Sequence, residues 1–159
     1  MATSLRLFAT IIAASMLAGS VAAEEQSLKF RVVMTEVGGS IMDIAALKGH
    51  AMASQKFAGV AVFEDGRIAY KTVVALTDIA DEKISYSGYS TYMFENGDVI
   101  VVKFTGGGSP ESNGGDYKVV SGEGAYKGAT GTGRFDSAKN PWDDAELYEG
   151  TISVKLAGG

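Results

Sequence analysis

The sequence predicts an all-β fold: a single-domain antiparallel eight-stranded β-barrel that follows an N-terminal signal peptide. Three observations support this prediction. From Leu28 onward, apolar and polar side chains alternate with a period of two, as they do in amphipathic strands. Turn signals such as Asn96-Gly97 separate these segments, and no long helical pattern interrupts them. Glycine is dense in 122–135, which favours the sharply bent strands of a closed barrel over a sandwich.

The first 23 residues have the layout of a secretory signal peptide. Arg6 is followed by an uncharged apolar run of about 15 residues, 7–21, and small residues up to Ala23 precede an acidic segment. A membrane anchor would need about 20 apolar residues and usually a cationic flank after them. We therefore expect cleavage of residues 1–23, with residues 24–159 forming the barrel domain of a secreted or periplasmic protein without stable membrane insertion.

Composition excludes several classes of function. Residues 24–159 number 136, enough for one domain with its own core. Because Arg6 is the only charge in the leader, its removal changes the net charge from −5 to −6, which argues against nucleic acid and anionic membranes as partners. The absence of cysteine and the single histidine, His50, exclude disulfides, thiolate chemistry and metal sites built from several imidazoles. We expect no metal, because the acidic pairs at 64–65 and 143–144 lack the spacing of a calcium loop. We also expect no cofactor.

The first strand is predicted in 28–36, LKFRVVMTE. One face of this strand carries Leu28, Phe30, Val32 and Met34. Glu36 continues the same face.

The next segment, 40–50, has apolar residues near helical spacing at Ile41, Ile44 and Leu47. Since Gly49 could end such a helix, the sequence predicts one short helix there.

The middle of the chain contains two strong strand patterns and a hairpin. In 67–76, one face carries Ile68, Tyr70, Val74 and Leu76. In 83–94, one face carries Ile84, Tyr86, Tyr92 and Phe94, with Gly88 and Ser90 between them. Asn96-Gly97 then suits a tight hairpin to a partner strand in 98–104. The segment 105–116 is rich in Gly, Ser, Pro and Asn, so we expect a connecting loop.

Three segments complete the expected seven or eight strands: 116–128, 129–138 and 145–156. One face of the last strand carries Tyr148, Ile152, Val154 and Leu156. Trp142 lies in a polar loop before this strand, next to a proline, where a loop anchor is favoured over a sugar contact.

Five glycines lie in 122–135, GEGAYKGATGTGRF. We expect them to bend the strands, and we expect Tyr126 and Phe135 to cover the space that they leave. A phosphate-binding loop would need a Lys-Ser/Thr pair and a following helix, and the sequence has neither here. The glycines therefore indicate a fold rather than a nucleotide site.

The same residues resemble a known superfamily. GEGAYKGATGTG, 122–133, is similar to the Gly-x-Gly-x-aromatic-x-Gly-Ala/Val-x-Gly signature of allene oxide cyclases and dirigent proteins, which share a small antiparallel eight-stranded barrel. FRVVMTEV, 30–37, resembles the first barrel strand of that superfamily, and LYEGTISVKL, 147–156, its closing strand. The resemblance spans most of 28–156. It implies a lumen that binds a small hydrophobic molecule and, in the enzymes, directs a ring closure or coupling without a cofactor.

The resemblance matches Glu36 to an acidic residue of the superfamily's first strand, which makes Glu36 the candidate catalytic residue. The His-Asp pair of dirigent proteins reads Thr35-Glu36 here. In an apolar lumen, burial would raise the pKa of Glu36 and make it a usable base or a stabiliser of a developing cation. The alternative is that the strand ends at Thr35 and leaves Glu36 at a solvated rim.

A set of apolar and aromatic side chains could line the lumen and bind the ligand. Its members are Phe30, Met34, Tyr70, Tyr86, Tyr92, Phe94, Phe104, Tyr126 and Phe135. The alternative for such residues is ordinary core packing. Three functions stay open: a cofactor-free cyclase or isomerase, a non-catalytic ligand-binding barrel, and an interaction protein whose barrel is filled by its own side chains. The expected partner is a small hydrophobic molecule, and homo-oligomerisation stays open as well.

Overall fold

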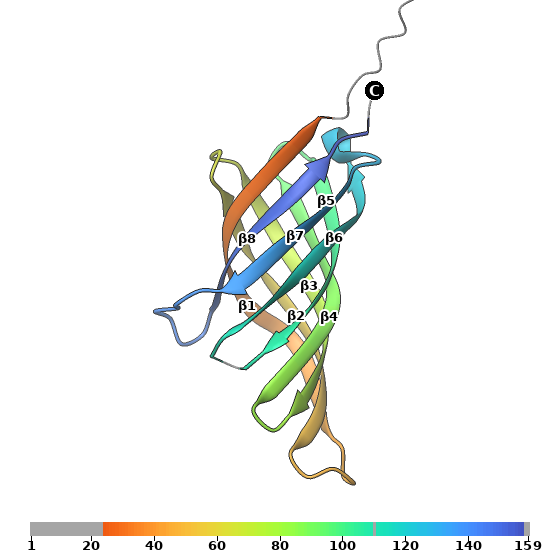
Figure 1. Ribbon diagram of the computed structural model, residues 1–159. Coiled ribbons are helices and arrows are strands. Elements are labelled where there is room, and N and C mark those ends of the chain that lie inside the picture. Colours follow the sequence, from red (N-terminus) through yellow and green to blue (C-terminus); the bar gives the residue numbers. More distant parts are fainter. Residues whose placement is uncertain (1–23, 110, 158–159) are drawn as a thin grey trace, which may run out of the picture.

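The computed structural model describes residues 24–109 and 111–157, so the predicted signal peptide lies outside the described residues. In the described part, eight antiparallel strands follow one another around a closed barrel, and β1 pairs with β8 to complete the ring (Figure 1). The elements are β1 (Glu25–Asp43), β2 (His50–Phe63), β3 (Ile68–Ala80), β4 (Lys83–Phe94), β5 (Val99–Gly108), β6 (Asn113–Glu123), the 3-10 turn η1 (Gly124–Tyr126), β7 (Thr130–Ser137) and β8 (Glu146–Lys155). The predicted all-β, antiparallel eight-stranded barrel is confirmed.

Alternate side chains of each strand point into the lumen, as the period of two predicts. In β1 the buried residues are Leu28, Phe30, Val32 and Met34, and the residues between them are exposed. In β4 and β8 the buried positions include Tyr92, Phe94, Ile152 and Val154. The predicted inward faces of these three strands are therefore confirmed.

Inward-facing aromatic rings lie directly opposite glycines of the neighbouring strand. The register gives six such pairs: Phe30 with Gly150, Phe104 with Gly88, Tyr86 with Gly106, Tyr117 with Gly133, and Phe135 with both Gly115 and Gly150. A Cβ atom on Gly150 would lie 2.6 Å from Cζ of Phe30, so the ring occupies the space of the missing side chain. Such pairs let a small barrel curve strongly while its lumen stays filled with ring surface.

In the glycine-rich segment 122–135, one of the two aromatic residues covers a glycine as predicted and the other does not. Tyr126 covers Gly122, whose added Cβ would lie 2.8 Å from Cβ of Tyr126. Gly124, in η1, has a φ of 63°, which favours glycine. Phe135, however, lies against Gly115 of β6 and not against the glycines of its own segment. The expectation for Tyr126 is confirmed, and that for Phe135 is wrong.

The predicted short helix in 40–50 is wrong. β1 continues to Asp43, and β2 begins at His50 after a hairpin in which Gly49 has a φ of 76°. Every residue of β1 from Thr35 to Asp43 is exposed. With solvent on both faces, this part of the strand needs no alternation of apolar residues, so its sequence does not look like a strand.

The predicted inward face of β3 points outward. Exposed fractions of 38–59% are found for Ile68, Tyr70, Val74 and Leu76. The inward residues are Ala69, Lys71, Val73, Ala75 and Thr77. Lys71 is the long side chain among them, and rings from β1, β4 and β6 lie around its amine. The predicted loop 105–116 is also mostly strand, since β5 extends to Gly108 and β6 begins at Asn113.

The barrel has two different ends. At the end we call the closed end, the loops β2–β3 and β4–β5 meet η1 and the first residues of β1 (Figure 1). At the other, the open end, lie the connections β1–β2, β3–β4, β5–β6 and β7–β8, and the β1–β2 hairpin extends beyond the barrel (Figure 1). Large aromatic residues such as Phe63 and Phe94 face inward near the closed end, whereas β3 places the smaller Ala75 and Thr77 inward toward the open end.

Candidate functional site

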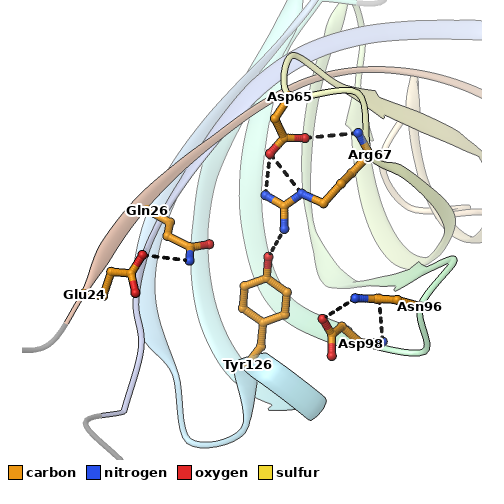
Figure 2. A network of polar contacts seen from close by, with 7 residues as sticks. All are labelled: Glu24, Gln26, Asp65, Arg67, Asn96, Asp98 and Tyr126. Carbon is orange, nitrogen blue, oxygen red and sulfur yellow. Dashed lines mark hydrogen bonds and ion pairs between the residues drawn. The ribbon is translucent and has the colours of Figure 1, made fainter.

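A polar cluster covers the closed end (Figure 2). The Arg67 guanidinium donates hydrogen bonds to the Asp65 carboxylate and to the Tyr126 hydroxyl. The hydrogen bond between the two side chains lowers the pKa of Asp65 and raises the pKa of Arg67. Cζ of Arg67 lies 5.4 Å from the centre of the Phe94 ring, on which the Tyr126 ring stacks at 5.6 Å. This cluster shields the lumen from solvent at the closed end.

Below the cluster, aromatic rings fill the lumen. The Phe63 ring lies 5.1 Å from Phe94 and 5.6 Å from Phe30, centre to centre, and Phe30 lies 5.4 Å from Tyr92. All four residues are buried. Edge-to-face and tilted contacts at these distances are favourable packing for aromatic rings. The closed half of the barrel is therefore a solid core.

The open half contains a cavity of about 270 Å³. Its apolar and aromatic walls are Met34, Phe57, Val73, Ala75, Ile79, Ile84, Tyr86, Phe104, Tyr117, Phe135 and Tyr148. Its polar walls are Gln55, Lys71, Thr77, Ser90, Asn113 and Glu146. Apolar walls with a few polar groups are typical of small-molecule sites, and this volume lies just below their usual range of about 300–1,000 Å³.

β3 runs along the cavity from floor to mouth. Its inward residues in that order are Lys71, Val73, Ala75, Thr77 and Ile79. Lys71 and Ile79 are separated by about 26 Å of strand at the usual rise per residue. Lys71 is buried, whereas Ile79 is half-buried near the β3–β4 connection. The cavity is thus closed at Lys71 and reaches solvent at the open end.

The mouth of the cavity is polar. Asn113 accepts hydrogen bonds from the hydroxyl groups of Tyr86, at 2.9 Å, and Tyr148, at 3.0 Å. Burial raises the pKa of Tyr86 to about 12 and also raises the pKa of Tyr148 above its ordinary value. Both phenols therefore remain donors at neutral pH. Glu146 is exposed at the rim, yet the cavity walls desolvate its carboxyl group and raise its pKa, and the charge of Glu36 adds to the rise.

Lys71 lies at the floor of the cavity and is 2% exposed. Its Nζ donates a hydrogen bond to the Tyr117 hydroxyl at 3.1 Å. The same Nζ lies 5.0 Å from the ring centre of Tyr92, 5.6 Å from that of Tyr117 and 5.7 Å from that of Phe30. Burial lowers the pKa of Lys71 to about 7. Near neutral pH the amine is therefore present in both its charged and its neutral form.

Two phenols complete the floor. The Tyr92 hydroxyl donates to the Tyr117 hydroxyl at 3.3 Å, and burial raises the pKa of both groups well above the ordinary value of 10.0. Both tyrosines therefore keep their protons at neutral pH. Lys71, Tyr117 and Tyr92 form a connected chain of exchangeable protons inside an otherwise apolar wall.

The structure divides the predicted ligand-binding residues into three groups. Those that line the cavity are Met34, Tyr86, Phe104 and Phe135. Those that pack in the closed half are Phe30, Tyr92, Phe94 and Tyr126. Tyr70 is 50% exposed on the outer face of β3, so the prediction that it faces the lumen is wrong. The error follows from the reversed face of β3, where small residues point inward.

Glu36 lies near the mouth but does not line the cavity. It is exposed, its carboxylate accepts a hydrogen bond from Gln55 at 3.4 Å, and a β-bulge separates it from Gly38. This position agrees with the alternative of a solvated rim. The catalytic role of Glu36 stays a prediction.

Sequence reasoning missed the floor of the cavity. It placed Ile68, Tyr70, Val74 and Leu76 on one face of β3 and did not consider Lys71, which shares the inward face with the buried Ala69 and Val73. The available signal was the register across the β2–β3 hairpin. Residues opposite each other share a face, so an outward Val62 pairs with an outward Ile68 and leaves Lys71 inside.

The fold and the cavity define a class: small antiparallel eight-stranded barrels with a lumen open at one end. No family model matches the chain, and no curated protein matches it. Among the described residues, no helix is long and apolar enough to cross a membrane, and no cluster of metal-ligating side chains is found.

Solved structures of this class resemble the chain. The pterocarpan synthase dirigent protein GePTS1 has a TM-score of 0.58 and 14% identity, with 95% of this chain and 98% of that chain covered. The pterocarpan synthase dirigent protein PsPTS1 has a TM-score of 0.57 and 13% identity, with 87% and 99% covered. A DUF3224-family protein of unknown function from Shewanella oneidensis MR-1 has a TM-score of 0.51 and 17% identity, with 86% and 99% covered. The resemblance to dirigent-type barrels is confirmed for the fold.

Proposed function

We propose that the protein is exported and binds a small hydrophobic molecule in the cavity at the open end. The observation that carries this proposal is the cavity of about 270 Å³, whose walls are mostly apolar and carry a few polar groups, among them Lys71 at the floor. Lys71 and Tyr117 at the floor can orient one polar group of a ligand, and the walls formed by Val73, Ala75 and Phe104 can bury its apolar body.

Two matched variants on β3 test binding. Ala75 lines the cavity, whereas the adjacent Val74 is 55% exposed on the outer face. Binding of the neutral dye N-phenyl-1-naphthylamine is followed by its fluorescence. We expect saturable binding to the wild type, a loss of about tenfold or more in affinity for Ala75→Phe because the added ring occupies the cavity, and wild-type affinity for Val74→Phe.

The same measurement can overturn the proposal. Absence of saturable binding to the wild type, or equal affinities for Ala75→Phe and the wild type, would show that the cavity is not a binding site. Thermal unfolding of both variants checks that each is folded at the temperature of the assay.

A second candidate is a cofactor-free cyclase or isomerase that uses the same cavity. The raised pKa of the Glu146 carboxyl group favours it, because a carboxyl group of this kind can act as a general acid or base. Glu36 contributes to that rise through its charge. Mass spectrometry of molecules that co-purify with the native protein identifies a test compound. Turnover of this compound is then compared between the wild type, Glu146→Gln and Glu36→Gln. A catalyst loses turnover in these variants, whereas a binding protein converts nothing in any form.

Export rests on the sequence of residues 1–23. Expression of the full chain in a bacterium, followed by fractionation and intact-mass measurement, tests it. We expect a mature protein that begins at Glu24 in the periplasm or the medium. An uncleaved chain confined to the cytosol would contradict export and leave the binding proposal standing.

A further inference from the structure

We propose that the Lys71 amine forms a covalent imine with aldehyde or ketone ligands that enter the cavity. The proposal rests on the binding function above and adds the chemical class of the ligand. It starts from the placement of one primary amine at the floor of an apolar cavity, with a phenol hydroxyl 3.1 Å from its nitrogen.

The surroundings of Nζ leave a place for a ligand atom. Among the described residues, the hydrogen bond that Nζ makes is the one to Tyr117, although a lysine amine can make up to three. The rings of Phe30, Tyr92 and Tyr117 cover Nζ from the closed half. The remaining direction is toward the cavity that Lys71 lines. A carbonyl group carried by a ligand would therefore meet the amine at the floor.

The amine is available as a nucleophile. Desolvation is the cause of its lowered pKa, about 7, and no carboxylate contributes. The titratable groups that face it are the phenols of Tyr117 on β6 and Tyr92 on β4, and the others that line the cavity are Tyr86, Tyr148 and Glu146 toward the mouth. Slightly above neutral pH, most molecules carry the neutral amine, whose lone pair can attack a carbonyl carbon.

The reaction balances with groups that are present. The nitrogen lone pair forms a bond to the carbonyl carbon, and the carbonyl oxygen takes a proton to give a carbinolamine. Loss of the second N–H proton and departure of the hydroxyl group as water then form the C=N bond. Tyr117 can donate the proton that the oxygen needs and recover one from the nitrogen, with Tyr92 hydrogen-bonded behind it. One amine and one carbonyl compound give one imine and one water, with no oxidant or reductant.

Three compounds with one carbon skeleton test the proposal: 2-naphthaldehyde, 2-naphthoate and 2-naphthylmethanol. Each is incubated with the folded wild-type protein at pH 8, sodium cyanoborohydride is added to reduce any imine to a stable amine, and the protein is analysed by intact mass and peptide mapping. We expect one adduct, with the aldehyde alone, at Lys71. The yield at Lys71 should exceed that at any exposed lysine by about tenfold or more, because an ordinary lysine is almost entirely protonated at this pH.

Two variants provide controls. Lys71→Met removes the amine and keeps an unbranched apolar side chain, so we expect the adduct to disappear, and thermal unfolding checks that the variant is folded. Lys103→Met removes an exposed lysine on the outer face of β5 and should leave the adduct unchanged. The adduct yield with the wild type should rise from pH 6 to pH 8 as the amine loses its proton.

The outcomes separate this inference from the binding function. Displacement of the dye by the aldehyde without an adduct at Lys71, or adducts spread evenly over exposed lysines, would overturn the imine and keep the binding site. Tighter binding of 2-naphthoate, again without an aldehyde adduct, would show that Lys71 pairs with anions instead. Failure of the dye and all three compounds to bind would overturn the binding function itself.

Discussion

The closed and open halves of the barrel use the same strands and the same alternation, yet one half is solid and the other hollow. In the closed half, the Phe63 ring packs against Phe30 and Phe94, and the Arg67 cluster covers this core. In the open half, β3 turns small side chains such as Ala75 toward the axis and a cavity remains. An eight-stranded barrel has room for its own side chains or for one small ligand, so the size of a few inward residues decides between them.

The floor residues mark the boundary between the halves. Lys71 and Tyr117 form the floor of the cavity, while the rings of Phe30 and Tyr92 pack against Nζ of Lys71 from the closed half. A buried amine costs stability and an apolar side chain would not. Its presence at this boundary is therefore better explained by the cavity than by the core.

The largest expected effect concerns this boundary. The pKa of Lys71 falls from an ordinary 10.5 to about 7 on folding, and this difference corresponds to about 5 kcal/mol. Between these two values the unfolded chain binds more protons at Lys71 than the folded chain does, so stability rises with pH across this window and the full penalty applies below pH 7. We expect Lys71→Met to exceed the wild type in free energy of unfolding by about 5 kcal/mol at pH 6 and by about 2 kcal/mol at pH 9.

Urea unfolding at both pH values measures this difference. For Lys103→Met, on the outer face, the difference from the wild type in free energy of unfolding should not change with pH. A constant difference between Lys71→Met and the wild type across the window would show that Lys71 is not desolvated, and the boundary between the two halves would then be wetter than the structure describes.

The next effect compares a phenylalanine from each half. Phe63, 3% exposed, packs among the rings of Phe30, Tyr92 and Phe94, so Phe63→Ala should lower the free energy of unfolding by about 3–5 kcal/mol. Phe57, 9% exposed, lines the cavity and lacks neighbours on that side, so Phe57→Ala should cost about half as much. Denaturant unfolding of the two variants decides. Equal losses would mean that the open half is packed as tightly as the closed half.

The smallest effect concerns the cover of the closed end. Tyr126→Phe removes the hydroxyl group that accepts a hydrogen bond from Arg67, and it should cost about 1–2 kcal/mol because the donor is charged and partly buried. Tyr70→Phe removes an exposed hydroxyl group on the outer face and should change stability by less than about 0.5 kcal/mol. Indistinguishable melting curves for the two variants would show that the polar cluster does not hold the closed end together.

The sequence predicted the architecture well because the closed barrel depends on patterns that are local. Alternation over Leu28–Met34 and the glycines near Tyr126 both follow from geometry that neighbouring residues share. The hairpin beyond Thr35 was missed because a strand with solvent on both faces carries no such pattern.

The site was harder to predict because it depends on which face of β3 is inward. Alternation of large apolar residues favoured Tyr70 and Leu76, but the inward positions of this strand hold Lys71 and short side chains such as Ala75. The position of Lys71 at the cavity floor thus follows from packing between distant segments, which alternation within one strand does not contain. Glu36 is a different case: it pairs with the inward Phe57, as the alternation predicts, but it lies where β1 leaves the barrel and is therefore exposed.

The pairing of rings with glycines has a consequence for how such a lumen can evolve. Phe104 and Tyr86, which line the cavity, rest on Gly88 and Gly106, and a methyl group at either glycine would displace the ring and the adjoining backbone. Glycine and alanine codons differ by a single base. One nucleotide change on a neighbouring strand is therefore enough to reshape the chamber without any substitution among the residues that line it.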